Sequence, residues 1–101
     1  MIALTPTDLQ AELIEKAKPY ESISKIVLFG SRARGDNRRV SDFDICVFCD
    51  EERDYIGYYF DVEEIDTFYK IDVLRHSDSM NDALKTEILK DGVVLYERKA
   101  Q

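Results

Sequence analysis

A polar turn between two short apolar runs is the feature that most constrains the fold of this chain. The first run, residues 25–29, is β-branched and aromatic and stops at Gly30, which is typical of a buried strand. In the second run, residues 42–48, a side-chain period of two places Asp42 and Asp44 on one face of a strand and apolar side chains in a core. The sequence therefore predicts two strands joined by a loop of mostly polar and charged residues.

The turn itself has the composition of a phosphate-binding loop. Gly30 and Ser31 end the first strand and are expected to open a short helix. Backbone N–H groups at such a helix start, together with a serine hydroxyl, hold phosphate oxygens, and glycine lets the ligand approach the main chain. Arg32 and Arg34 are placed to reach the same oxygens, with surface salt bridging as the alternative.

Two carboxylates on one strand face favour a divalent cation as their partner. Like charges about 4 Å apart cost roughly 1 kcal/mol even in water, and a shared cation removes that cost. Oxygen-only ligands select a hard ion, Mg²⁺ or Mn²⁺, which also bridges the phosphates of a nucleotide. Asp72 lies within a further apolar run, residues 69–74, and is the candidate third carboxylate if the strands are neighbours. The alternative for Asp72 is an exposed residue on an edge strand.

These motifs occur together in a known superfamily. The glycine–serine pair, ten intervening residues, the Asp-x-Asp pair and a later strand aspartate resemble the nucleotidyltransferases of the DNA polymerase β type. Within that superfamily, residues 30–35 and 41–44 are similar to the minimal nucleotidyltransferases (MNT), MntA-type antitoxins encoded beside HEPN-domain toxins in prokaryotes. The resemblance is strong over residues 25–48, moderate at Asp72, and elsewhere lies only in the order of elements.

The resemblance implies a catalytic role for three carboxylates, as ligands of Mg²⁺ or Mn²⁺: Asp42, Asp44 and Asp72. It implies that Asp72 also draws the proton from the attacking hydroxyl, and that Gly30 and Ser31 hold the phosphates of a nucleotide. The reaction implied is transfer of a nucleoside monophosphate from a triphosphate, commonly AMP from ATP, with pyrophosphate leaving.

The acceptor that the resemblance implies is a tyrosine hydroxyl of a HEPN ribonuclease toxin. The chain would then be an antitoxin, and a hetero-oligomer with the toxin is the expected assembly. Two alternatives stay open. One is a binding antitoxin that neutralises its toxin by contact alone, and the other is a transferase for small molecules such as aminoglycosides.

Length and charge limit the classes of partner. A chain of 101 residues has the size of one domain, so we expect a single nucleotidyltransferase domain over residues 1–101. Its 14 basic and 21 acidic residues give a net charge of −7, which repels a polyanion, so direct nucleic-acid binding is not expected. Cys46 and Cys49 are expected to be free thiols in a reducing cytosol. Neither a leader pattern nor a membrane span is expected, which favours a cytoplasmic protein.

The remaining pattern predicts a mixed α/β fold. A first helix is expected to begin at Thr5 or Thr7, a last helix to begin at Ser79 and end at Gly92, and a strand to follow over residues 93–96. Together these elements predict the polymerase β-like nucleotidyltransferase fold, a mixed β-sheet with helices mainly on one face.

Two further segments carry expectations about packing. Leu84, Ile88 and Leu89 of the last helix are expected to turn inward. The aromatic segment 55–60 is expected to pack as a core helix, with a docking surface as the alternative, because tyrosines beside acidic residues are common at interfaces. His76 is assigned no role.

Overall fold

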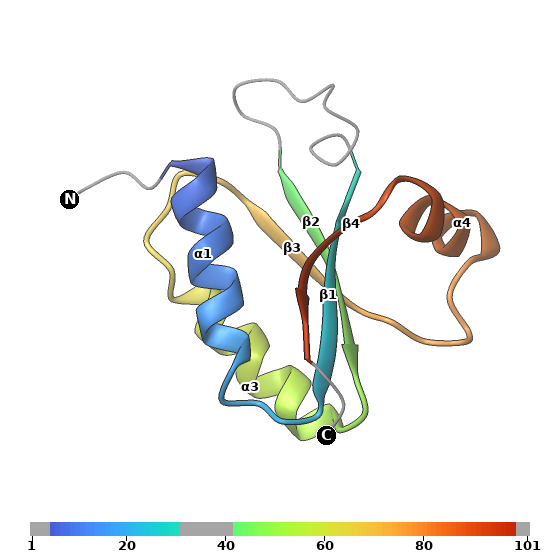
Figure 1. Ribbon diagram of the computed structural model, residues 1–101, viewed down its shortest axis with the longest axis horizontal. Coiled ribbons are helices and arrows are strands. Elements are labelled where there is room, and N and C mark those ends of the chain that lie inside the picture. Colours follow the sequence, from blue (N-terminus) through green and yellow to red (C-terminus); the bar gives the residue numbers. More distant parts are fainter. Residues whose placement is uncertain (1–4, 31–41, 99–101) are drawn as a thin grey trace.

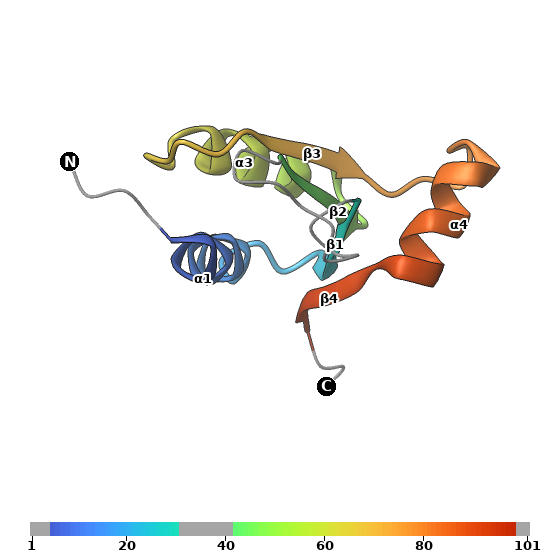
Figure 2. The ribbon, with the colours of Figure 1, turned by 90° about the horizontal axis from the view of Figure 1, so that it is seen from above.

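The computed structural model describes residues 5–30 and 42–98 of the chain. Its helices and strands have these bounds: α1 Pro6–Ala17, β1 Ile23–Phe29, β2 Phe43–Cys49, α3 Glu52–Glu63, β3 Ile71–Arg75, α4 Asp82–Asp91 and β4 Val93–Glu97. The strands form one sheet in the order β3-β2-β1-β4, in which β1 runs antiparallel to β2 and β4, and β3 runs parallel to β2. Helices α1 and α3 lie on one side of the sheet and α4 on the other (Figure 1 and Figure 2). The expected mixed sheet with helices mainly on one face is confirmed.

Helix α1 begins at a cap that the sequence predicts. The Asp8 backbone N–H donates to the Thr5 hydroxyl oxygen at 3.1 Å, and the Thr5 backbone N–H donates to the Asp8 carboxylate at 3.4 Å. This reciprocal pair satisfies backbone donors that a helix start otherwise leaves unpaired. Leu9, Leu13 and Ala17 then recur at helical spacing and are fully buried, so the helix docks on the sheet through one apolar face.

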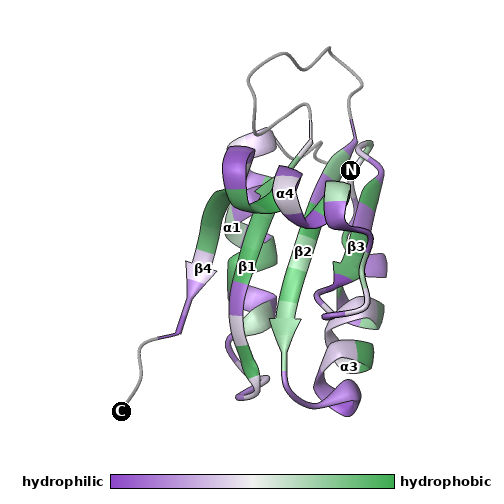
Figure 3. Ribbon diagram, turned by 90° about the vertical axis from the view of Figure 1, so that its right-hand side faces the viewer, coloured by the Kyte–Doolittle hydropathy of each residue, from purple (hydrophilic) through white to green (hydrophobic). Residues whose placement is uncertain are grey.

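Apolar side chains cover both faces of the sheet. The central strands β1 and β2 are apolar over most of their length (Figure 3). One face packs against α1 and α3, where Tyr58 is fully buried and its hydroxyl donates to the Leu13 carbonyl at 3.0 Å. The other face packs against α4 through Val27, Cys46 and Ile88. The alternating side chains of β1 and β2 therefore serve two separate apolar layers.

The N-cap of α4 corrects one expectation. The helix begins after Asn81, whose side-chain oxygen accepts from the backbone N–H groups of Ala83 at 2.8 Å and Leu84 at 3.4 Å. Ser79 was expected at this place, but its hydroxyl lies 2.9 Å from the hydroxyl of Ser77, in the turn before the helix. Both residue types are good caps, so composition alone does not choose between them.

The packing of α4 corrects a second expectation. Ile88 is buried and Leu84 is half-buried, as expected, and Gly92 ends the helix. Leu89 is 79% exposed, so the expectation that it turns inward was wrong. It follows Ile88 directly, and one residue along a helix is a rotation of about 100°, which carries the side chain away from the buried face.

The aromatic segment 55–60 forms part of α3 and divides between core and surface. Tyr58 lies in the core, which confirms the expected core helix. Ile56 and Phe60 of the same helix are 45% and 62% exposed. Helix α3 therefore carries an apolar surface in addition to its buried face.

Two general expectations concern thiols and membranes. Cys46 and Cys49 are free cysteines, as expected. Burial raises the pKa of the Cys46 thiol to about 11, so this group stays protonated at neutral pH.

Within the described ranges, no helix combines the length and the apolar character needed to cross a bilayer.

Candidate functional site

Asp44 on β2 and Asp72 on β3 are direct neighbours across the sheet. The register of this parallel pair aligns Asp44 with Asp72 and Ile45 with Val73. Because side chains alternate along a strand, the two carboxylates leave the face opposite to that on which Ile45 and Val73 pack toward α1 and α3. The two strands that carry these aspartates are therefore adjacent, and both side chains share one face.

Gly30 brings the end of β1 against the Asp44 carboxylate. It follows Phe29, which is aligned with Asp44 in the register of β1 and β2. The φ angle of Gly30 is +79°, and a Cβ atom at this position would lie 2.5 Å from Asp44 Oδ2. Both the left-handed backbone and the close approach require glycine. The start of the predicted phosphate-binding turn thus lies in contact with a predicted metal ligand.

Asp44 lies where a negative charge is unfavourable. Partial burial, then the charge of Asp72 and a hydrogen bond between the two carboxyl groups, raise the pKa of Asp44 from 3.8 to about 6. The charges of Asp42 and Glu87 contribute to the same rise. The Lys70 ammonium group lies 3.7 Å from Asp72 Oδ1. Because both side chains are exposed, this ion pair offsets little of the negative charge. The site therefore favours the uptake of a proton or a cation.

The structure brings some of the predicted site residues together, whereas others lie outside the described residues. Gly30, Asp44 and Asp72 lie together, and Asp42 lies directly before β2, from where its charge acts on Asp44. Across the described parts of the chain, no group of three or more His, Cys, Asp or Glu side chains is arranged to hold a metal ion. The three-carboxylate ligand set thus stays a prediction. The other predicted nucleotide-binding residues lie outside the described residues: Ser31, Arg32 and Arg34.

The donor chemistry of the Asp44 and Asp72 pair fits a hard divalent cation. Both donors are carboxylate oxygens, the ligand type that Mg²⁺ and Mn²⁺ prefer. The proximity of Asp72 raises the pKa of Asp44, so the pair favours a proton or a cation over two free negative charges. A cation in that place would satisfy both carboxylates in their ionised form and return the pKa of Asp44 toward its ordinary value.

Two charged residues near the site were missed by sequence reasoning. Glu87 of α4 is half-buried and acts electrostatically on Asp44. Helical spacing in the sequence could have revealed Glu87, because it lies three residues after half-buried Leu84 and directly before buried Ile88. Lys70 forms the ion pair with Asp72, and its signal was the strand period, because the two lie two residues apart.

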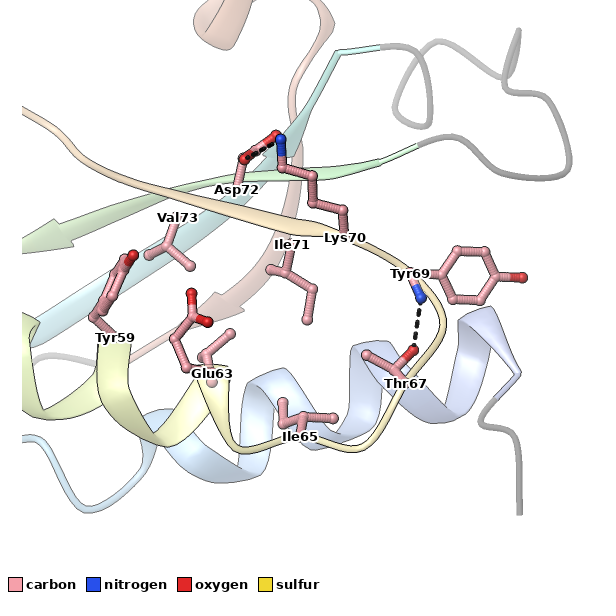
Figure 4. A pocket seen from close by; sticks show the side chains of 10 residues that line it. Tyr59, Glu63, Ile65, Thr67, Tyr69, Lys70, Ile71, Asp72 and Val73 are labelled. Carbon is pink, nitrogen blue, oxygen red and sulfur yellow. Dashed lines mark hydrogen bonds and ion pairs between the residues drawn. The ribbon is translucent and has the colours of Figure 1, made fainter. Parts of the chain in front are cut away.

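A pocket of about 450 Å³ lies next to this site, between α3, β3 and the segment that joins them. Glu63 rises from α3 toward β3, and Ile71 and Val73 descend from β3 toward α3 (Figure 4). Asp72 lies on the opposite side of the same strand (Figure 4). The pocket lining includes Asp72 of this strand and Lys70 directly before it, as well as Glu63 and apolar side chains, so the pocket adjoins the carboxylate pair.

Comparison with known sequences identifies the family of this fold and site. The family described as polymerase beta, nucleotidyltransferase matches residues 11–101. A protein of Methanocaldococcus jannaschii named "Putative protein adenylyltransferase" is 49% identical over 41 residues, which cover 41% of this chain and 41% of that protein. The match thus spans about two fifths of that relative.

Comparison with solved structures agrees on the fold. A crystal structure of a toxin–antitoxin with AMP-PNP has a TM-score of 0.67 at 22% identity, over 89% of this chain and 74% of that chain. A complex of the tri-AMPylated Shewanella oneidensis HEPN toxin with MNT antitoxin has a TM-score of 0.59 at 17% identity, over 89% and 71%. At these identities the likeness is one of fold. Because the family match extends over most of the sequence, the chain belongs to the polymerase beta nucleotidyltransferase family.

Proposed function

We propose that the chain is a Mg²⁺-dependent nucleotidyltransferase that transfers AMP from ATP to a tyrosine hydroxyl of a partner HEPN toxin, and so acts as a cytoplasmic antitoxin. One observation carries this proposal. Asp44 and Asp72 are aligned on one face of the sheet, and Gly30 lies against Asp44 at the start of the predicted phosphate-binding turn. Cation and phosphate binding would therefore occur at one place.

Each part of the site has a role in the proposed reaction. The bound cation would be held by the three aspartates and would stabilise negative charge on the phosphates. The backbone at Gly30 would let the triphosphate approach the carboxylates, and Ser31, Arg32 and Arg34 would contact its oxygens. Asp72 would accept the proton of the attacking hydroxyl. A new oxygen–phosphorus bond would form at the α-phosphate as the bond to pyrophosphate breaks.

The substrate and the partner are supported by the relatives. The name of the Methanocaldococcus protein specifies adenylyl transfer to protein. One structural relative was crystallised with AMP-PNP, and another holds a HEPN toxin that carries AMP groups. The net charge of −7 suits a basic protein acceptor better than a nucleic acid. The relatives favour a protein acceptor over an aminoglycoside, whereas the charge suits either because both are cationic.

The unfavourable negative charge at Asp44 argues against the alternative that the chain neutralises its toxin by contact alone. A carboxylate whose pKa is raised to about 6 is an unfavourable residue unless it has a function in the ionised form. A chain that only binds its toxin would gain stability from a neutral residue at this position.

The test is label transfer with matched variants. The chain is incubated with Mg²⁺, ATP labelled at the α-phosphate and a HEPN protein encoded beside it. We expect label on the HEPN protein, lost in Asp44→Asn and in Asp72→Asn, because both remove a carboxylate from the pair. Asp78→Asn makes the same chemical change at an exposed turn and is expected to keep transfer. Equal labelling by all four proteins would overturn the proposal.

A further inference from the structure

Strand β3 is one of the two edge strands of the described sheet, and its pairing with β2 defines which of its backbone groups point outward. The Phe43 N–H donates to the Lys70 carbonyl at 2.9 Å, and the His76 N–H donates to the Val47 carbonyl at 2.9 Å. Backbone groups alternate in direction along a strand, so the even-numbered residues between these bonds also point toward β2. The backbone groups of Ile71 and Val73 therefore point outward.

One of these outward groups is already occupied. The Tyr55 hydroxyl of α3 donates to the Val73 carbonyl at 3.2 Å. In the part of the chain that the structure describes, no strand pairs with the remaining outward groups of β3, which are the N–H and carbonyl of Ile71, the N–H of Val73 and the backbone groups of Arg75. The part of this open edge that precedes the Tyr55 contact is short and lies level with Asp72.

The pocket described above lies beneath this open edge. Ile71 and Val73 form its apolar side, and Glu63 points into it from α3 (Figure 4). The segment that leaves α3 adds the exposed acidic residues Glu64 and Asp66. The edge therefore combines unpaired backbone groups, apolar lining and negative charge, a combination that fits an extended and basic polypeptide.

Two elements that line the pocket also carry exposed aromatic side chains. Phe60 of α3 is 62% exposed, and Phe68, in the segment that leads to β3, is 80% exposed. Large exposed apolar side chains on elements that border a pocket are typical of a protein interface.

We infer that the β3 edge binds an extended, basic segment of the protein acceptor as an added strand, with the acceptor hydroxyl residue level with Asp72. This inference rests on the proposed function and specifies how its acceptor binds. Neighbouring strands lie about 4.8 Å apart, and aligned residues share a face. The hydroxyl side chain would thus lie beside Asp72, on the side away from Asp44.

The same register assigns the neighbouring residues of the acceptor. Residues directly before and after the hydroxyl residue would point to the opposite face, into the pocket beside Ile71 and Val73. Apolar side chains suit these two positions, and lysine or arginine further out suits Glu63, Glu64 and Asp66. When the hydroxyl oxygen attacks the α-phosphate of ATP, its proton would pass to Asp72 and pyrophosphate would leave.

Amide exchange tests the added strand directly. The probe is a synthetic peptide with the sequence valine-tyrosine-valine flanked by lysines, added to the full chain without nucleotide. We expect hydrogen exchange to slow at the Ile71 and Val73 amides, because they gain partners, and to change least at Asp72 and Leu74, which already bond to β2. Peptide binding that leaves the first two amides unchanged, or no detectable binding, would overturn the inference.

A proline variant tests the backbone contribution. Val73→Pro removes an outward N–H and leaves the bonds to β2 in place, which an edge position tolerates. We expect peptide affinity to fall roughly tenfold or more. Asp78→Pro introduces the same residue in an exposed turn outside this edge and is the control, with affinity expected to stay within about twofold. A folded Val73→Pro chain, checked by circular dichroism, that binds the peptide like wild type would contradict strand addition.

A charge reversal tests the pocket independently of backbone changes. Glu63→Lys is expected to weaken binding of the basic peptide by roughly tenfold, whereas Glu21→Lys makes the same change at an exposed turn and should leave it unaltered. Equal affinities for both variants would contradict the acidic pocket as the binding surface.

Peptide binding and label transfer are measured separately, so that the docking surface and the transferase activity can each be refuted independently of the other. Peptide binding without label transfer from ATP would refute the proposed transferase and leave the docking surface standing. Label transfer to the peptide by folded Val73→Pro with an unchanged KM would refute the docking surface and leave the transferase standing.

Discussion

The Asp44→Asn variant is expected to be more stable than the wild-type chain at pH 7, although it removes a proposed catalytic residue. The pKa of Asp44 is raised from 3.8 to about 6, chiefly by burial and by Asp72. At about 1.36 kcal/mol per unit, a rise of this size corresponds to about 3 kcal/mol. Because the carboxylate is only partly buried, solvent screening reduces this to about 1 kcal/mol. An amide of nearly the same shape would keep a hydrogen bond to Asp72 without the charge.

The expected pH dependence follows from the sign of the shift. A raised carboxyl pKa means that the folded chain favours the protonated form, so its stabilising contribution is complete below pH 3.8 and is lost as the pH rises through about 6. Wild type and Asp44→Asn should therefore have similar stability at pH 4. They should differ at pH 7 by about 4–8 °C in Tm for each 1 kcal/mol.

Thermal unfolding followed by circular dichroism without divalent cations measures this difference. The exposed variant Asp78→Asn is the control and is expected to unfold like wild type at both pH values. Adding Mg²⁺ at pH 7 should raise the Tm of wild type and not that of Asp44→Asn, because ligand binding stabilises only the state that binds. A lower Tm for Asp44→Asn at pH 7, or an equal difference at pH 4 and 7, would refute the electrostatic reasoning.

Four further substitutions test other parts of the structure. Gly30→Ala should lower the free energy of unfolding by about 1–3 kcal/mol, because the φ of +79° disfavours a side chain and the added Cβ would lie 2.5 Å from the Asp44 carboxylate. Urea unfolding measures this difference, and unchanged stability would refute the prediction. Asn81→Ala should cost about 1 kcal/mol through loss of the α4 cap, whereas Ser79→Ala should cost little; thermal unfolding that ranks the two in reverse would show the cap assignment to be wrong. Tyr58→Phe should cost about 0.5–1.5 kcal/mol by removing one buried hydrogen bond to the Leu13 carbonyl. Chemical denaturation with no loss of stability would argue against that bond.

Much of the site could be predicted because its signals are local. The period of two around Asp44 and around Asp72 identified two strands with their carboxylates opposite the apolar positions, and the structure has this arrangement. The apolar run that stops at Gly30 indicated a strand end, and the φ of +79° shows why glycine is required there. Local periodicity and turn chemistry therefore sufficed for the elements that carry the site.

Other features depend on contacts that no local pattern encodes. Ser79 and Asn81 are equally good caps by residue type, and only the course of the chain before α4 selects Asn81. Glu87 acts on Asp44 because α4 packs on the carboxylate side of the sheet, which is a tertiary fact. The position of β3 at the edge, with Tyr55 closing one carbonyl, likewise depends on strand order. The single domain over residues 1–101 stays a prediction.

Binding of ATP with Mg²⁺, measured by isothermal titration calorimetry, tests most directly whether the paired aspartates beside Gly30 form a nucleotide site. We expect saturable binding of Mg²⁺ and ATP to the wild-type chain and to Asp78→Asn. We expect affinity weaker by about tenfold or more in the double variant Asp44→Asn, Asp72→Asn, whose folding is checked by its Tm. Undiminished binding by the double variant, or failure of the wild-type chain to bind any nucleoside triphosphate with Mg²⁺, would contradict the account.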